Sequence, residues 1–306
     1  MGDLKLKILV TGGAGFIGSH LVDALIKKGA KVSIIDNLST GRKENINPKA
    51  TFYRMDMNDK KGAGIFKKEK PDIVFHLAHN TNMHKSVEDP IFDAHGIIGS
   101  LNIFNLAREN CVKKIIMASS AMVYGNYPSR LLPVTEEHLS QSDSPYAISK
   151  IATENYLRFF NRTYKLPIVI LRYPTVYGPR QVGGAMADYI IKIAKGRSGD
   201  MFGDGKLTRD YVYVDDIIGA NLLALDYKGK ELIFNLGSSK EVTLNNLHQK
   251  IAHLFKSKSS LKPIYHPVRL GEIFRFCVSH KKAKRELGWQ PTVNLEEGLK
   301  RTICKI

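Results

Sequence analysis

A glycine-rich turn near the N-terminus limits the possible folds of this chain most strongly. Lys5 to Val10 is an apolar run typical of a buried strand, and TGGAGFIG follows directly from Thr11 to Gly18. An amphipathic segment then continues to about Lys28. Strand, glycine turn and helix in this order are the context in which such a pattern predicts a dinucleotide-binding fold.

Three glycines of this turn have distinct expected tasks. Gly12 permits the tight turn, Gly15 lets the backbone approach a pyrophosphate, and Gly18 lets the helix pack closely on the sheet. The free N–H groups at the start of the helix would then face the anion.

Strand and helix patterns alternate through the first half of the chain. Strands are expected at residues 31–35, 51–55, 72–78, 113–118 and 167–171, and helices at 91–110 and 144–164. This alternation predicts a Rossmann fold of the α/β class, with a doubly wound parallel sheet and right-handed crossovers.

The pattern becomes less regular after residue 171, where glycine-rich loops surround one or two helices. We therefore expect an NAD-binding domain at residues 1–171 and about 212–238. A smaller, mixed α/β domain for the substrate is expected at about 172–211 and 239–306.

Several polar or small residues stand where predicted strands end. In an open parallel sheet, ligands bind at the carboxyl ends of the strands, where Asp36, Asp56, Ala78 and Ser120 are expected. Asp36 lies about 20 residues beyond the glycines, at the usual place of the acid that holds an adenosine ribose, and this favours NAD over NADP.

A tyrosine and a lysine are expected to share one face of the helix at 144–164. Tyr146 and Lys150 are four residues apart, so their side chains are neighbours on a helix. Such a pair is common on surface helices. Following a dinucleotide fingerprint and the strand-end Ser120, it indicates a catalytic site.

Composition excludes some classes of protein. Hydrophobic residues make up 43% and charged residues 25% of the 306 residues, as in globular proteins, and no stretch is long and apolar enough to span a bilayer. The three cysteines show neither pairing nor metal spacing, which favours a reducing cytoplasm and no metal site. The net charge of +17 is spread over many lysines without accompanying aromatic residues. It favours an anionic substrate over nucleic acid.

Many segments, in order, resemble the extended short-chain dehydrogenases/reductases that act on nucleotide sugars, and the UDP-glucose 4-epimerase group above all. They are TGGAGFIGSH, DNLSTG (36–41), HLA (76–78), SVEDP (86–90), SSAMVYG (119–125), SPYAISK (144–150), RYPTVYGPRQ (172–181), GDGKLTRDYVYVDD (203–216), RLGE (269–272) and KAKRELGW (282–289). The resemblance covers nearly the whole chain and implies NAD as cofactor, a UDP-sugar as substrate and a homodimer.

The resemblance also implies a mechanism. Tyr146, as a phenolate, would take the proton from the sugar's 4-hydroxyl while hydride passes from C4 to NAD, and Ser120 would bind the same oxygen. Lys150 would hold the nicotinamide ribose and lower the tyrosine pKa. A free tyrosine has a pKa of about 10, so reaching neutrality requires about 4 kcal/mol, which Lys150 and the positive nicotinamide ring together could supply.

Further residues receive roles from the same resemblance. The cofactor would contact Gly12, Gly15, Phe16, Ile17, Gly18, Asp36, Asn37, Asp56, Met57, Leu77, Ala78, Tyr146, Lys150 and Pro174. The substrate would contact Ser120, Tyr146, Thr175, Arg209, Arg269, Glu272 and Phe276. Of these, Arg209 and Arg269 would clamp the pyrophosphate, Glu272 would bind a ribose, and Phe276 would favour a plain hexose over an N-acetyl sugar.

Two neighbouring residues favour epimerisation over elimination. Dehydratases and decarboxylases of this superfamily place an acid just after the Ser/Thr that Ser120 matches. Ala121 and Met122 stand there in this chain, and neither can act as an acid or base.

Other positions depart from the family pattern. His79 and His84 lie in a stretch that is usually small and less basic, and Gly96 replaces an asparagine near the cofactor. Pro174 and Thr175 stand where Phe and Asn are usual. These departures leave two alternatives open: an enzyme acting on another UDP- or dTDP-sugar, such as a uronic acid, and a non-catalytic NAD-bound protein that binds nucleic acid.

Overall fold

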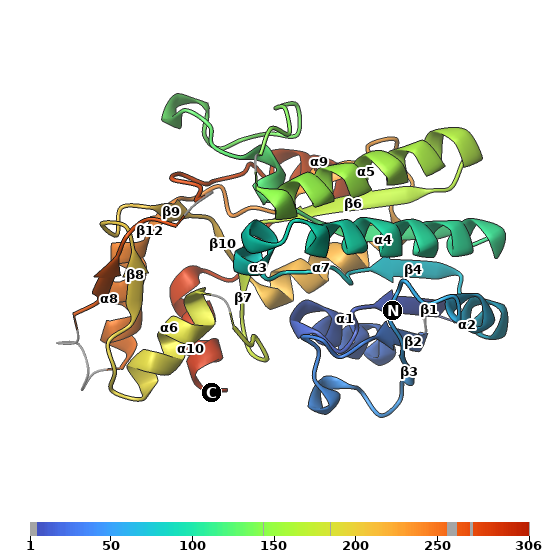
Figure 1. Ribbon diagram of the computed structural model, residues 1–306, viewed down its shortest axis with the longest axis horizontal. Helices are drawn as coiled ribbons and strands as arrows, with labels where there is room; N and C mark the ends of the chain where they lie inside the picture. The colour runs from blue at the N-terminus through green and yellow to red at the C-terminus, as the bar shows by residue number, and fades with distance from the viewer. Residues whose placement is uncertain (1–4, 143, 184, 256–261, 270–271, 306) are drawn as a thin grey trace.

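A seven-stranded parallel sheet forms the centre of the larger part of the molecule (Figure 1). The computed structural model describes residues 5–142, 144–183, 185–255, 262–269 and 272–305, without the side chains at 83, 84 and 185. The strands follow the order β11-β6-β5-β4-β1-β2-β3, and this confirms the predicted doubly wound topology. Their bounds are β1 (Lys7–Thr11), β2 (Lys31–Asp36), β3 (Thr51–Arg54), β4 (Ile73–His76), β5 (Lys114–Ser120), β6 (Ile168–Tyr173) and β11 (Ile233–Asn235).

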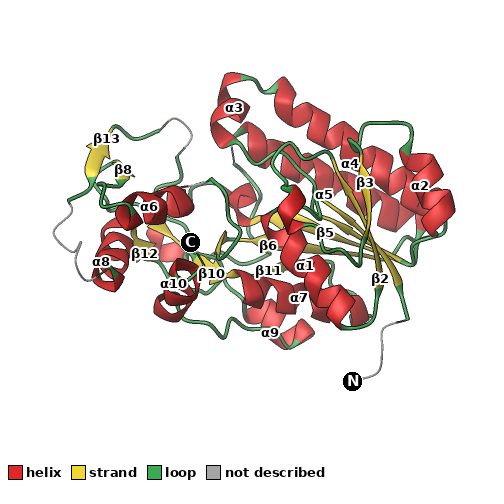
Figure 2. Cartoon of the chain, turned by 90° about the horizontal axis from the view of Figure 1, so that it is seen from below, coloured by secondary structure: helices red, strands yellow, loops and turns green. Residues whose placement is uncertain are grey.

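Helices cover both faces of this sheet (Figure 2). One face packs against α1 (Phe16–Lys27), α7 (Val214–Asp226) and α9 (Lys281–Leu287). The other packs against α2 (Gly62–Glu69), α4 (Ile91–Glu109) and α5 (Pro145–Tyr164), and the short α3 (Met83–Glu88) precedes α4.

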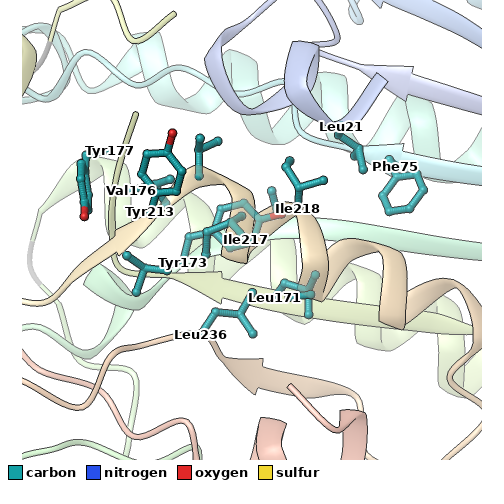
Figure 3. Close-up of a cluster of buried hydrophobic side chains, with 14 of the residues drawn as sticks. Leu21, Phe75, Leu171, Tyr173, Val176, Tyr177, Tyr213, Ile217, Ile218 and Leu236 are labelled. Carbon is teal, nitrogen blue, oxygen red and sulfur yellow. The ribbon is translucent and has the colours of Figure 1, made fainter. Parts of the chain in front are cut away.

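Alternation along the strands divides the core into two layers. Ile8 and Val10 point towards the α1 and α7 side, whereas Leu9 packs with the α4 and α5 side. Figure 3 shows the first layer, where Phe75 and Leu171 of the sheet lie with side chains of α1 and α7. Buried strands with both faces covered explain why these segments are almost continuously apolar.

The smaller part, at the left of Figure 1, consists of short strand pairs and helices. Its strands pair as β7 with β10, β9 with β12 and β8 with β13. The bounds are β7 (Thr175–Tyr177), α6 (Ala185–Ala194), β8 (Asp200–Phe202), β9 (Thr208–Arg209), β10 (Tyr211–Tyr213), β12 (Val242–Thr243), α8 (Leu244–Leu254), β13 (Ile264–His266) and α10 (Leu295–Ile303). Among the helices in the described part of the chain, none combines the length and apolar character needed to cross a membrane.

Candidate active site

The glycine turn brings β1, α1 and the end of β4 into close approach. Gly12 has φ +71°, and a Cβ there would lie 2.8 Å from the amide nitrogen of Ala78. A Cβ at Gly18 would lie only 2.1 Å from the Gly12 oxygen, so α1 can begin against the turn only with glycine there. Helix α1 has no side-chain cap and no acidic residue in its first turn, which leaves its N-terminus suited to an anion.

Asp36 ends β2 with its carboxylate held in place by the backbone. Its Oδ2 accepts a hydrogen bond from the Ala14 amide at 3.0 Å, and its Oδ1 accepts one from Leu38 at 2.8 Å. Nearby, the side-chain amide of Asn37 donates to Asp56 at 2.7 Å. The structure thus gathers the expected ribose-binding acid and its neighbours at the carboxyl edge of the sheet.

Ser120, Tyr146 and Lys150 meet where β5 ends against the first turns of α5. Helix α5 begins here because the Ser144 hydroxyl accepts from the Ala147 amide at 3.3 Å and proline occupies the first helical position. The buried Lys150 Nζ donates to the Ala118 carbonyl at 2.9 Å.

Burial dominates the ionisation of this group. It raises the pKa of Tyr146 to about 12, against a lowering by the hydrogen bond with Ser120, and Asp93 raises it further. Burial lowers the pKa of Lys150 to about 7, while Glu154 and Asp93 raise it. In the protein alone burial outweighs the effect of the Ser120 hydrogen bond on the tyrosine pKa, and the depression of this pKa by Lys150 stays a prediction. For both groups burial disfavours the charged form, and it is the largest cause of each shift.

Two histidines at the end of β4 are each bonded to a serine of a helix. His76 Nε2 lies 2.9 Å from Ser100 Oγ, and His79 Nε2 lies 2.9 Å from Ser149 Oγ. Each serine gives its single proton to its own helix, Ser100 to the Gly96 carbonyl and Ser149 to the Tyr146 carbonyl, both at 2.7 Å. Both histidines must therefore donate from Nε2.

Asp93 is a buried carboxylate at the start of α4. It is 2% exposed, and neither of its oxygens has a hydrogen-bond partner among the described residues. Burial raises its pKa, although the nearby Ser86 and, to a smaller extent, Lys150 oppose this. Asp93 thus adds negative charge that acts on both the tyrosine and the lysine.

Among the expected substrate residues other than Ser120 and Tyr146, two pair with each other. Arg209 forms an ion pair with Glu272 and donates to the Thr208 and Ile273 carbonyls at 2.7 Å each. Its guanidinium is therefore already engaged, and a pyrophosphate would have to share it.

The other expected substrate residues lie outside the Arg209–Glu272 ion pair. The Arg269 guanidinium lies 3.4 Å from the centre of the Phe202 ring, and its Nε has no partner among the described residues. Phe276 is 5% exposed and packs in an apolar cluster beside the loop that follows Ser120. Thr175 opens β7, directly after Pro174. The side chain of His84 lies outside those that the structure describes.

A buried ion pair joins the catalytic helix α5 to β6. Arg172 of β6 donates to both carboxylate oxygens of Glu154, at 2.9 and 2.5 Å, and to the Tyr124 hydroxyl at 2.7 Å. Ser119 also donates to Glu154, which lies one turn beyond Lys150. Ser119, Tyr124 and Arg172 lie in motifs that carry the family resemblance, but the sequence predicts no role for them or for Glu154. In the sequence, His79 and Gly96 stand out as departures from the family pattern.

A parallel sheet with a glycine turn, and a tyrosine and lysine beside a strand-end serine, define an enzyme of the extended short-chain dehydrogenase/reductase class. The model of the NAD dependent epimerase/dehydratase family matches residues 8–237, and the chain belongs to that family. NAD is accordingly its cofactor. Three features fit this cofactor: the close approach of the backbone at Gly12 and Gly18, the uncapped N-terminus of α1, and the Asp36 carboxylate that the backbone holds in place.

Similar proteins align over almost their whole length. A UDP-glucose 4-epimerase from Thermotoga maritima, solved with UDP-glucose, is 42% identical, with 97% of each chain covered and a TM-score of 0.94. One from Thermus thermophilus, solved with NAD, is 35% identical, with 97% of this chain and 98% of that chain covered and a TM-score of 0.91. A UDP-glucose 4-epimerase from Mycolicibacterium smegmatis is 38% identical, with 97% of each covered.

Proposed function

We propose that this protein interconverts UDP-glucose and UDP-galactose by epimerisation at C4, using bound NAD. The observation that carries the proposal is the meeting of Ser120, Tyr146 and Lys150 at the end of β5 and the start of α5. This site lies in a chain that matches UDP-glucose 4-epimerases from end to end.

The chain's own residues supply the proton chemistry. Tyr146 removes the proton from the 4-hydroxyl and later returns it, and Ser120 orients the same oxygen. When bound, NAD supplies a reversible acceptor for the C4 hydride. Since burial and Asp93 hold the pKa of Tyr146 at about 12 against the Ser120 hydrogen bond, a phenolate near neutrality depends on positive charge brought close to the ring. Protonated Lys150 and oxidised nicotinamide are the two sources available.

The residues beside Ser120 support epimerisation without elimination. Ala121 is fully buried in the apolar cluster that contains Phe276, and Met122 packs against that cluster. Neither side chain can donate or accept a proton, so no group at these positions assists the loss of water.

We assign the two ligands to the two parts of the molecule. Residues 1–171 and about 212–238 would hold NAD, and about 172–211 with 239–306 would hold the nucleotide sugar. Arg269 remains the better candidate for the pyrophosphate, because the Arg209 guanidinium is already bonded to Glu272 and to backbone carbonyls. Phe276 would still limit the pocket to a plain hexose.

We also assign a homodimer and a cytoplasmic location. Helices α4 and α5 present exposed apolar side chains on one surface, among them Ile98 at 53%, Ile148 at 51% and Phe159 at 42%. An apolar surface of this kind fits a self-complementary interface. All three cysteines are unpaired, as in a reducing compartment, and a place in galactose metabolism follows from the substrate.

A panel of UDP- and dTDP-sugars, including uronic acids and N-acetyl sugars, with products identified by NMR, tests the proposal. UDP-glucose and UDP-galactose should interconvert, and Tyr146→Phe should abolish interconversion while NAD binding persists. Full turnover by the variant would refute the mechanism. Turnover of only another sugar would refute the substrate.

A further inference from the structure

His79 contacts the catalytic tyrosine in two ways that the proposed proton chemistry does not use. Its ring meets the Tyr146 ring edge to face, with centroids 5.7 Å apart and an interplanar angle of 65°. Its Nε2 donates to Ser149, and Ser149 donates to the main-chain carbonyl of Tyr146. His79 thus contacts the side chain of Tyr146 directly and its backbone through one hydroxyl.

The imidazole occupies space that only a glycine at position 96 leaves open. A Cβ at Gly96 would lie 2.9 Å from Cε1 and 3.1 Å from Nδ1 of His79. Contacts this short force a neighbour to move, and the ring is the group that could move. His79 and Gly96 are therefore one structural unit that joins the segment after β4 to α4 and α5.

We propose that His79 is a positioning residue for Tyr146, held by Ser149 in the space above Gly96, and that it fixes the orientation of the phenol towards Ser120. The proposal rests on the proposed function, since it assigns His79 to the same proton transfer. Two contacts then define the phenol: Ser120 at the hydroxyl and His79 at the ring edge. Aromatic edge contacts and buried hydrogen bonds both favour one side-chain orientation over others.

The first test replaces His79 with alanine. We expect kcat to fall between about tenfold and a hundredfold, as for small misplacements of a catalytic group, with KM changed less than about twofold. NAD affinity should remain near that of the wild type.

A second readout separates positioning from a general loss of structure. The ionisation of Tyr146 can be followed by ultraviolet difference titration, with the titration of Tyr146→Phe subtracted. The groups facing the pair are Lys150 of α5, His76 of β4, Asp93 of α4 and Ser120 of β5. Because burial lowers the pKa of His79 well below its usual value, the imidazole is neutral, and its removal takes away no charge. A shifted tyrosine titration in His79→Ala therefore reports the loss of the ring contact and not the loss of a charge.

Ser149→Ala removes the hydroxyl between His79 and the Tyr146 carbonyl, and a buried hydroxyl on another helix serves as its matched control. Thr302 of α10 is buried like Ser149, and its hydroxyl donates to a carbonyl of its own helix, that of Gly298, at 2.7 Å. We expect Ser149→Ala to lower kcat and shift the titration as His79→Ala does, and Thr302→Ala to do neither. Equal losses of activity in all three variants would overturn the proposal.

Gly96→Ala tests the same unit without removing the ring. The added methyl should displace His79 and lower kcat, although alanine favours the helix. In His79→Ala/Gly96→Ala the methyl has no ring to meet, so kcat should fall no further than in His79→Ala alone. If the loss of kcat in the double variant equalled the combined losses of His79→Ala and Gly96→Ala, the proposal would be overturned.

Failure of this inference differs from failure of the proposed function. If the wild type does not interconvert the UDP-sugars, the proposed function fails, yet the Tyr146 titration still reports on His79. If Tyr146→Phe is inactive while His79→Ala keeps wild-type kcat and an unshifted titration, only the role of His79 is refuted.

Discussion

His76 illustrates how a single buried residue links the site to stability. It donates to Ser100 and accepts from Thr11, so both ring nitrogens are engaged in the neutral form. Burial lowers its pKa to about 3. A proton that binds the histidine in the unfolded chain is therefore rejected by the folded one.

This linkage predicts acid sensitivity with a definite sign. Between pH 6.5 and 3 the unfolded state binds more protons at His76, so stability is lost as the pH falls. The contribution should be about 2 kcal/mol between pH 7 and pH 5. Urea unfolding of His76→Gln at the two pH values should show a dependence smaller by this amount. The exposed His253→Gln should retain the wild-type dependence, and equal behaviour of the two variants would contradict the prediction.

The buried ion pair of Arg172 and Glu154 links the catalytic helix α5 to the stability of the fold. Their side chains are 5% and 4% exposed, and they join β6 to α5 one turn beyond Lys150. Removing one partner leaves the other charge buried without compensation, which costs more than the intact pair contributes.

Arg172→Met should accordingly destabilise the protein by about 3–5 kcal/mol. Glu154→Met added to it should restore a large part of this loss, because no unpaired charge then remains. Urea unfolding of the two single variants and the double variant measures the coupling. A double variant no more stable than Arg172→Met would show that the buried charge is not the cause.

The close contact between Gly18 and the glycine turn predicts how a substitution at the start of α1 changes stability and NAD binding. Gly18→Ala should lower stability by about 1–3 kcal/mol and weaken NAD binding, because its methyl overlaps the Gly12 carbonyl. Gly64→Ala on α2 is the control, since its methyl would meet no atom within 4 Å. It should stabilise the protein by about 0.5–1 kcal/mol. Calorimetric NAD titration and thermal unfolding distinguish the two variants.

Elements with local patterns could be predicted from the sequence. The helix Ile91–Glu109 and the start of β2 at Lys31 match the expected bounds, because periodicity and turn residues are local properties. The links His79–Ser149 and Arg172–Glu154 could not be predicted, because each joins segments that only the folded sheet brings together. The substrate and cofactor roles of the expected site residues stay predictions.

At the scale of the whole molecule, the basic charge has a partly local explanation. Cations occupy the last turns of several helices: Lys27 of α1, Lys67 and Lys68 of α2, Lys284 and Arg285 of α9, and Lys300 and Arg301 of α10. Positive charge there is favoured by the helix dipole. The cations are thus spread over the ends of several helices. This distribution argues against a single basic surface for nucleic acid.

The proposed dimer can be tested with two exposed residues of equal accessibility. Phe159 of α5 and Leu223 of α7 are both 42% exposed, on helices that cover opposite faces of the sheet. Phe159→Glu should place an unpaired charge in the interface and yield monomers, whereas Leu223→Glu should remain dimeric. Sedimentation velocity distinguishes these outcomes. A dimer unaffected by Phe159→Glu would exclude the α4–α5 surface.

The close approach between positions 79 and 96 also has a consequence for descent. A side chain at position 96 and an imidazole at 79 cannot share the same space. An asparagine at 96 would therefore displace a histidine at 79 from the place that it holds here. Relatives that retain a histidine at the first position should carry glycine at the second. A chain that gained the histidine while it kept the asparagine would be an overcrowded intermediate.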